Sequence, residues 1–380
     1  MHNRLRAVVI GAGWAGDGHT TALRWCGVEV AAICGRDPGV VGRVAERLSI
    51  AEASTDWRET LDRVRPDIVT IGTPAALRLD VVEVALSLGC HVLCEKPLAV
   101  GCLEAEQMYH LARDAGVKHA YASTHRYDPS VAWLAELVCD GAIGRLTDVV
   151  GTFRSSFPPV LPYSWALESE QGGGLLNNAF THDLGILARI VGGEPVRAMG
   201  RAQTVHAKAP VVPGTHDFRQ WLATAYELTP ERVTSLEWRP FEADLGYDAI
   251  LELASPAGRV GVTVAAGPGV PGPSEVDGWR LHGESGTLQA DAQGMFAYST
   301  SRVRARGEAP EPLPTPQRLV DDLPRVGDDV ENKWCALVRD FVADVKGERH
   351  QPYLTFRDGW RYQVAIDAIR SGAGWRELPA

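Results

Sequence analysis

The feature that most constrains the fold is a glycine-rich segment near the start of the chain. Residues 8–16 read VVIGAGWAG, an apolar run that leads into the pattern G-x-G-x-x-G at Gly11, Gly13 and Gly16. In a strand–turn–helix unit the first glycine permits a tight turn, the second lets backbone approach a pyrophosphate, and the third lets helix pack on strand. A purely structural turn is the alternative. Because the motif heads a series of strand–helix units, dinucleotide binding is favoured.

Strand and helix patterns alternate along the first third of the chain. Apolar strand patterns occur at 5–10, 28–34, 67–71, 91–94 and 117–122, with helical patterns between them at 14–26, 38–48, 75–88 and 103–115. Near-continuous apolar strands separated by helices indicate a parallel sheet that is covered on both faces. Right-handed crossovers then give a doubly wound α/β fold. We predict a dinucleotide-binding Rossmann domain over residues 1–124.

The pattern changes after residue 125. Helices are predicted at 129–139, 181–191, 330–345 and 356–371, strands at 146–153, 249–253, 259–265, 279–282 and 287–290, and proline-rich loops at 157–162, 268–273 and 308–316. Short strands separated by glycine-containing turns are typical of an antiparallel sheet. We therefore predict an α+β domain over residues 125–380. The segments 157–162 and 204–218 are interpreted either as substrate loops or as connectors.

Composition and charge narrow the range of partners. The chain has 380 residues, 45% hydrophobic and 23% charged, which is ordinary for globular domains. A net charge of −10 without a block of Lys or Arg argues against nucleic acid or an anionic membrane as partner. The start lacks a signal-peptide pattern, and the seven cysteines lack a C-x-x-C pair. We expect a cytoplasmic protein with buried thiols and no metal.

The end of the second predicted strand bears on the cofactor. About 20 residues after the glycine motif, NAD sites usually carry an Asp or Glu for the ribose hydroxyls; here the chain reads Gly35, Arg36, Asp37. Gly35 removes a carboxylate that would repel a 2′-phosphate, and Arg36 is able to pair with that phosphate bidentately. We therefore expect a preference for NADP, with NAD as the alternative. Asp37 could still reach the ribose, and Arg36 could be only a solvated surface charge.

Two further motifs resemble those of a known family. The strand at 91–94 runs into Glu95-Lys96-Pro97, and residues 172–178 read GGGLLNN, followed by His182. Together with the glycine motif, this pattern resembles the Gfo/Idh/MocA oxidoreductases, the family of glucose–fructose oxidoreductase and inositol dehydrogenases. The resemblance spans nearly the whole chain. The joint pattern is specific for the family and not for one substrate.

The resemblance implies a fold, a reaction and an assembly. The second domain would contain a large open antiparallel sheet, and the protein would form a homodimer or homotetramer. The reaction would transfer a hydride between nicotinamide and a hydroxyl or ketone of a sugar, amino sugar or cyclitol. Lys96 would be the active-site lysine and His182 the active-site histidine. Asn178 stands where the family frequently has Asp, so a proton relay through a carboxylate is in doubt.

The resemblance also assigns residues to the site. Arg126 would match a common family arginine, whereas Arg78 stands where a histidine is common. Tyr163 and Trp165 would stack on a sugar ring or anchor a loop. The predicted catalytic residues are Lys96, His182 and Asn178; the predicted cofactor-binding residues are Gly11, Gly13, Trp14, Ala15, Gly16, Arg36, Asp37, Thr73, Pro74, Glu95, Lys96 and Arg126; and the predicted substrate-binding residues are Tyr163, Trp165, Asn177, Asn178, His182 and Asp183.

The expected chemistry needs a base for the hydroxyl proton and the corresponding acid in the reverse direction. Lys96, partly desolvated beside a cationic nicotinamide, would have a lowered pKa. His182 has an intrinsic pKa suited to proton exchange near neutral pH. We expect Lys96 to polarise the substrate oxygen and His182 to exchange the proton. The alternatives are a redox-neutral oxidation–elimination enzyme acting on a glycoside, or a non-catalytic nucleotide-sensing regulator.

Overall fold

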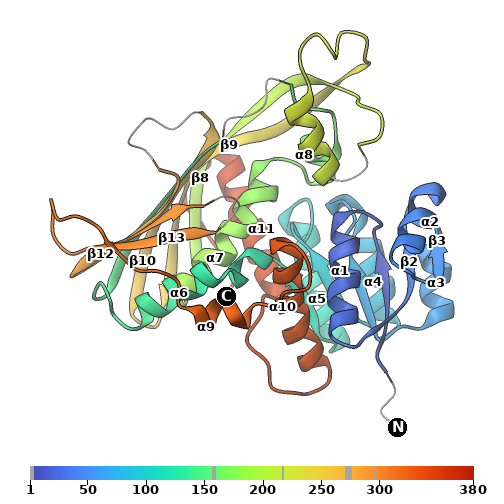
Figure 1. The fold of residues 1–380 in the computed structure, drawn as a ribbon, viewed down its shortest axis with the longest axis horizontal. Coiled ribbons are helices and arrows are strands. Elements are labelled where there is room, and N and C mark those ends of the chain that lie inside the picture. Colours follow the sequence, from blue (N-terminus) through green and yellow to red (C-terminus); the bar gives the residue numbers. More distant parts are fainter. Residues whose placement is uncertain (1–3, 156–159, 216–217, 270–275, 294–296) are drawn as a thin grey trace.

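The N-terminal part of the molecule is a six-stranded parallel sheet in the order β3-β2-β1-β4-β5-β6. The computed structural model describes residues 4–155, 160–215, 218–269, 276–293 and 297–380. The strands are β1 (Arg6–Ile10), β2 (Glu29–Cys34), β3 (Glu52–Ser54), β4 (Ile68–Ile71), β5 (His91–Glu95) and β6 (His119–Ala122). The chain winds outward from β1 in both directions, with helices on both faces (Figure 1). This confirms the predicted doubly wound fold.

Capping residues in the sequence mark where helices of this part begin and end. They are α1 (Trp14–Trp25), α2 (Pro38–Arg47), α3 (Trp57–Val64), α4 (Leu79–Ser87) and α5 (Cys102–Ala115). Asp37 caps α2 by accepting a hydrogen bond from Val40 N, and Gly116 ends α5 in the left-handed conformation. The helix predicted over 75–88 is split into a 3₁₀ turn, Ala75–Leu77, and α4.

The second part contains a nine-stranded sheet in the order β14-β13-β12-β11-β7-β10-β9-β8-β15. Its strands are β7 (Leu146–Ser155), β8 (Glu194–Pro210), β9 (Trp238–Ser255), β10 (Gly258–Pro268), β11 (Gly278–Gly283), β12 (Gly286–Ala292), β13 (Tyr298–Val303), β14 (Glu311–Pro312) and β15 (Arg376–Glu377). The open sheet is antiparallel as predicted except between β7 and β10, which are parallel. Parallel neighbours need a crossover connection, and here helix α7 (Thr181–Val191) and two further strands lie between them in the sequence.

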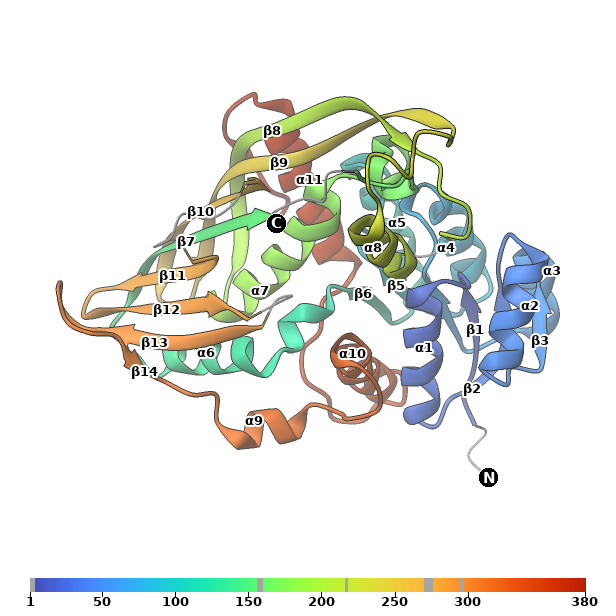
Figure 2. The same ribbon diagram turned by 45° about the horizontal axis from the view of Figure 1, so that its top comes forward.

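The segment 204–218, interpreted as a loop, is in part a strand. The first half of 204–218 continues β8, which pairs with β9 as far as Pro210 opposite Trp238. The resulting arm carries helix α8 (Phe218–Glu227) and extends from the sheet toward the N-terminal part (Figures 1 and 2). Residues 204–208 of β8 and 238–242 of β9 are exposed or half-buried, so this part of the hairpin has no consistently buried face. Residues 216–217 of that segment, and parts of the predicted loops 157–162 and 268–273, lie outside the described residues, while the loop 308–316 contains β14.

The C-terminal helices return to the N-terminal part. The second part also contains α6 (Pro129–Cys139), α9 (Gln317–Asp322), α10 (Asp329–Val345) and α11 (Phe356–Ser371). Helix α10 lies beside α1 (Figure 2), and its buried residues Trp334, Leu337 and Phe341 join one core cluster with Val9 and Leu23. Capping boxes start both α10 and α11. The boundary predicted at 124/125 stays a prediction, although the core of the first sheet includes this late helix.

Candidate functional site

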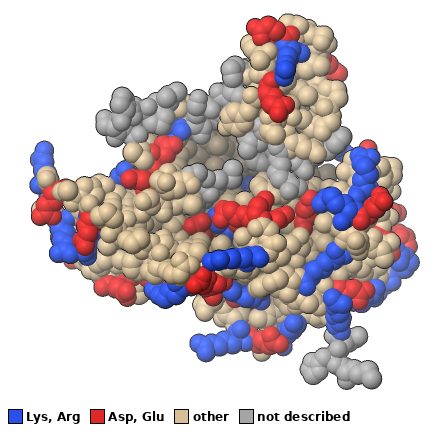
Figure 3. Space-filling view, viewed as in Figure 1, with Lys and Arg blue, Asp and Glu red and all other residues tan. Residues whose placement is uncertain are grey.

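A cavity of about 600 Å³ opens at the carboxyl ends of the parallel strands. This is the edge at which doubly wound folds bind ligands. Charges of both signs are interspersed over the molecular face shown in Figure 3. The predicted site residues that line the cavity are Gly11, Gly13, Trp14, Ala15, Arg36, Asp37, Thr73, Pro74, Glu95, Lys96, Trp165, Asn178 and His182. The cavity therefore brings together most of the residues predicted for cofactor, substrate and catalysis.

The glycine loop has the geometry of a phosphate cradle. Gly11 has φ +119°, and a Cβ there would lie 2.8 Å from the carbonyl carbon of Gly72. A Cβ at Gly16 would lie 1.9 Å from the Gly11 oxygen, so only glycine allows this helix to approach this strand. Gly13 is the N-cap of α1, and no side chain of the described residues caps it. The first N–H groups of α1 are thus available to an anion, and a dinucleotide pyrophosphate fits there.

The wall beside the loop is shaped by Gly35. A Cβ at this position would meet Cβ of Ala12 at 3.0 Å and Cβ of Val41 at 3.2 Å, so a carboxylate side chain has little room. Asp37 uses Oδ1 to accept the hydrogen bond from Val40 N at 2.8 Å. The Asp37 side chain is therefore engaged in capping α2. Arg36, which lies between Gly35 and Asp37 in the sequence, lines the cavity wall.

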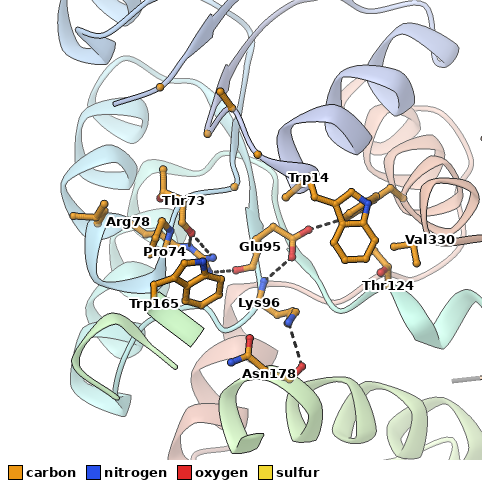
Figure 4. Close-up of a pocket in the computed structure, with 18 of the residues that line it drawn as sticks. Trp14, Thr73, Pro74, Arg78, Glu95, Lys96, Thr124, Trp165, Asn178 and Val330 are labelled. Atoms are coloured by element: carbon orange, nitrogen blue, oxygen red, sulfur yellow. Dashed lines mark hydrogen bonds between the residues drawn. The ribbon is translucent and has the colours of Figure 1, made fainter. Parts of the chain in front are cut away.

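Lys96 lines the cavity and directly follows β5. Its Nζ donates a hydrogen bond to the backbone oxygen of Asn178 at 3.1 Å, so that the side chain bridges the two parts of the molecule (Figure 4). The pKa of Lys96 is lowered to about 8, chiefly by burial; the negative charge of Glu95 opposes this shift, and the positive charge of Arg78 adds to it. The direction of this shift agrees with the expectation for Lys96, and burial is its main cause within the protein.

Asn178 contacts Lys96 through its backbone only. Its side-chain Nδ2 donates to the oxygen of Gly174 at 2.8 Å, within the π-helix Leu176–Phe180 that precedes α7. Short π-helices are frequent at functional sites because they redirect side chains. The start of this π-helix is held by Asp244, whose Oδ1 accepts from Leu176 N at 2.7 Å. Asn178 lines the cavity but does not face Lys96 with its amide.

His182 is accompanied by a second histidine that the sequence analysis did not assign. The His125 and His182 rings are 4.3 Å apart between centroids, at an interplanar angle of 69°. Burial, and the neighbouring positive charge of Lys96, hold the pKa of both histidines well below the usual value. The expectation that His182 titrates near neutral pH is therefore wrong, because the intrinsic pKa ignores desolvation. His125 follows β6, and this position at the strand end was the available signal.

The Arg78 side chain holds the segment Glu95-Lys96-Pro97 in place. Its guanidinium donates to the backbone oxygens of Thr73, Glu95 and Pro97, and the side chain is almost fully buried. Arg78, at the position where the family commonly has a histidine, thus links the backbone after β4 to the backbone at the end of β5. Its contacts go to the protein and fix the position from which Lys96 extends.

Several predicted residues do not line the cavity. Gly16 lies beneath the loop, and Arg126 is half-buried on η2 (Thr124–Tyr127) without reaching the cavity. Tyr163 donates its hydroxyl to Glu168 Oε1 at 2.7 Å and acts as a loop anchor. Asn177 accepts from Gln363, and Asp183 from the Tyr247 hydroxyl, both in the interior. Helical periodicity explains the last two, since residues adjacent to Asn178 and His182 point away from the face they share.

Other cavity residues come from distant parts of the sequence. Val330 and Trp334 of α10 also line the cavity, and Val330 lies across it from Pro74 and Trp165 (Figure 4). Within the described ranges, no group of three or more His, Cys, Asp or Glu side chains is placed to hold a metal ion. Among the same residues, no helix is both long enough and apolar enough to span a membrane.

The fold and the cavity define a two-domain oxidoreductase with a Rossmann cofactor domain. Comparison with known families specifies this class further. The model of an oxidoreductase family with an NAD-binding Rossmann fold matches residues 5–123, and the model of the GFO/IDH/MocA C-terminal domain matches residues 131–289. The chain belongs to the Gfo/Idh/MocA oxidoreductase family.

Individual relatives agree with this assignment. An uncharacterized oxidoreductase of Synechocystis sp. is 30% identical over 374 residues, covering 96% of this chain and 93% of the relative. The levoglucosan dehydrogenase of Pseudarthrobacter phenanthrenivorans is 30% identical over 200 residues, which is 50% of this chain and only 51% of that relative. A solved structure of levoglucosan dehydrogenase in complex with NADH has a TM-score of 0.79 at 22% identity, covering 99% of this chain and 100% of that chain. This last likeness shows the shared fold.

Proposed function

We propose that the protein is an NAD(P)-dependent dehydrogenase that acts on a hydroxyl or ketone of a sugar-like polyol. The observation that carries the proposal is one cavity that joins the glycine loop to Lys96, Asn178 and His182. The levoglucosan dehydrogenase among the relatives supports a sugar-like substrate.

The side chains suit this chemistry in a defined way. The bound nicotinamide would supply or accept the hydride. Lys96, with a pKa near 8, holds both protonation states close to neutral pH, so it donates a proton to a substrate carbonyl oxygen or accepts one from a hydroxyl. The uncharged imidazole of His182 orients a substrate hydroxyl by hydrogen bonding. Trp165, which also lines the cavity, offers an apolar face to a sugar ring.

Replacing Lys96 by Met tests the proposal. We expect kcat to fall by about 10²–10⁴-fold on an active polyol, because the proton donor and acceptor is removed. The assay is a panel of polyols and sugars with NADP and NAD, read at the absorbance of the reduced nicotinamide. Lys346→Met, at an exposed position, is the matched control and should leave turnover unchanged. Unchanged turnover in the Lys96 variant would refute the role.

The panel also separates the alternative functions. Turnover of a glycoside without net change in reduced nicotinamide would indicate oxidation followed by elimination. Cofactor binding without oxidation of any polyol would indicate a nucleotide-sensing regulator. The homodimer or homotetramer stays a prediction. Light scattering of the purified protein measures its molar mass in solution and so tests this prediction directly.

We propose NADP as the preferred cofactor. Support comes from the tight surroundings of Gly35 and from Arg36 on the cavity wall. Arg36→Ala should raise KM for NADP by about 10–100-fold, because a charge-assisted hydrogen bond is lost, and should leave KM for NAD nearly unchanged. Arg43→Ala, exposed on α2, is the matched control. An equal effect of Arg36→Ala on both cofactors would contradict the preference.

A further inference from the structure

The Glu95 carboxylate, beside Lys96, is held by contacts with three residues. Its Oε1 accepts from the indole Nε1 of Trp334 at 2.7 Å and lies 3.2 Å from Nε2 of His19. Its Oε2 accepts from the backbone N of Lys96 at 3.2 Å. Glu95 and His19 are buried. The carboxylate thus joins α10, α1 and the end of β5 at one point, and an ionised form there is stabilised by its donors.

The sequence is adapted to place Trp334 at this point. A Cβ on Gly18 would lie 2.1 Å from Cε3 of Trp334, so the indole packs directly on the backbone of α1. The ring meets Trp14 edge-on at 5.6 Å and His19 edge-on at 5.8 Å between centroids. Because three neighbours fix the plane of the indole, its N–H has one available direction, which is toward Glu95.

We propose that Trp334 is a positioning residue for Lys96, acting through the Glu95 carboxylate. The indole N–H holds Glu95 Oε1, which leaves Oε2 to fix the Lys96 backbone and keeps a negative charge beside the lysine side chain. The catalytic importance of this role rests on the proposed function. The placement itself rests only on the contacts of the protein.

Few titratable or charged groups surround Lys96 and Glu95. Lys96 is faced by Glu95, Arg78 and the two histidines of the cavity, and Glu95 is faced by His19, Lys96 and Arg78, with Cys94 and Tyr121 close by. Glu95 is the only carboxylate in this set. A change in its position or charge is therefore expected to alter the protonation of Lys96 more than any other single change.

The test measures the protonation of Lys96 without catalysis. Acetic anhydride labelling of the whole protein, followed by peptide mass spectrometry from pH 6 to about 11 across the usual lysine range, reports the apparent pKa of Lys96. Glu95→Gln removes the charge and should lower this pKa by about one unit. Trp334→Phe keeps the ring but removes the N–H donor, and should lower it by about half a unit. Trp25→Phe, exposed on α1, should not change it.

The double variant decides whether Trp334 acts through Glu95. Adding Trp334→Phe to Glu95→Gln should cause no further shift, because coupled residues are not additive. An unshifted labelling pKa in folded Trp334→Phe, or fully additive shifts, would overturn the inference. Trp334→Tyr, which retains an aromatic ring, takes the place of the Phe variant if that variant does not fold. Shifts as expected in a protein that oxidises no polyol would support the inference and refute the proposed function.

Discussion

At the scale of single residues, burial changes which groups titrate. Asp183 was predicted to bind substrate, but it lies in the interior, where the Tyr247 hydroxyl donates to its Oδ2 at 2.8 Å. Burial raises the pKa of Asp183 to about 7. The folded protein therefore retains a proton that the unfolded chain releases near pH 4, and this buried carboxyl makes the free energy of unfolding depend on pH.

The sign of this dependence follows from proton uptake. Between pH 4 and 7 the unfolded state binds fewer protons at Asp183 than the folded state, so stability falls as pH rises, by at most about 1.4 kcal/mol per pH unit. Asp183→Asn should remove this slope and gain stability relative to the natural chain toward pH 7. Urea unfolding at several pH values measures this dependence of the free energy of unfolding on pH. Asp140→Asn, an exposed control, should keep the slope of the natural chain, and a slope in Asp183→Asn equal to that of the natural chain would contradict the assignment.

The same scale shows why some site residues were predictable. Lys96 and His182 belong to local motifs whose residue types and order state their chemistry, and both lie in the cavity. His125, Arg78 and Trp334 carry no such motif. Their roles depend on neighbours that are distant in sequence, such as Glu95 for Trp334, 239 residues away. Only the folded chain brings these neighbours together.

At the scale of elements, the packing of α1 against α10 depends on a glycine with no motif role. Gly18→Ala should destabilise the protein by about 1–3 kcal/mol, because its Cβ would overlap the Trp334 ring. This loss exceeds the gain of about 1 kcal/mol that alanine gives a helix. Urea unfolding measures the difference.

The control for this prediction lies in the neighbouring helix. Gly42 is inside α2, and a Cβ there would meet nothing within 4 Å. Gly42→Ala should therefore stabilise the protein by about 0.5–1 kcal/mol. Equal effects of the two substitutions would show that the contact between Gly18 and Trp334 is not tight.

The prediction of helices and strands succeeded where burial gives the apolar residues a clear pattern along the sequence. The continuous apolar strands of the parallel sheet and the glycine-ended helices α5 and α7 were found from the sequence. Strand β8 and the outer half of β9 were not. The outer parts of these two strands form a two-stranded arm, which has no consistently buried face to produce alternation. The three-residue strand β3 was missed for lack of length.

At the scale of the whole molecule, the first domain is not built from the first third of the chain alone. Trp334, Cys335, Leu337, Val338 and Phe341 of α10 are buried in the core that includes β1 and α1. A fragment of residues 1–124 should therefore expose an apolar face and fail to unfold cooperatively. Thermal melting followed by circular dichroism checks this. A sharp transition comparable to that of the full chain would show that α10 is dispensable.

The return of α10 to the first sheet also has a consequence for synthesis on the ribosome. A nascent chain that has emerged to residue 320 already carries the glycine loop, Lys96 and His182, yet it lacks Val330 and Trp334 from the cavity wall. The wall is finished only when α10 has been translated and has docked on α1. Retention of a cofactor in the complete cavity thus becomes possible only late in synthesis, and a chain truncated between residues 320 and 329 would contain both sequence motifs and an incomplete cavity.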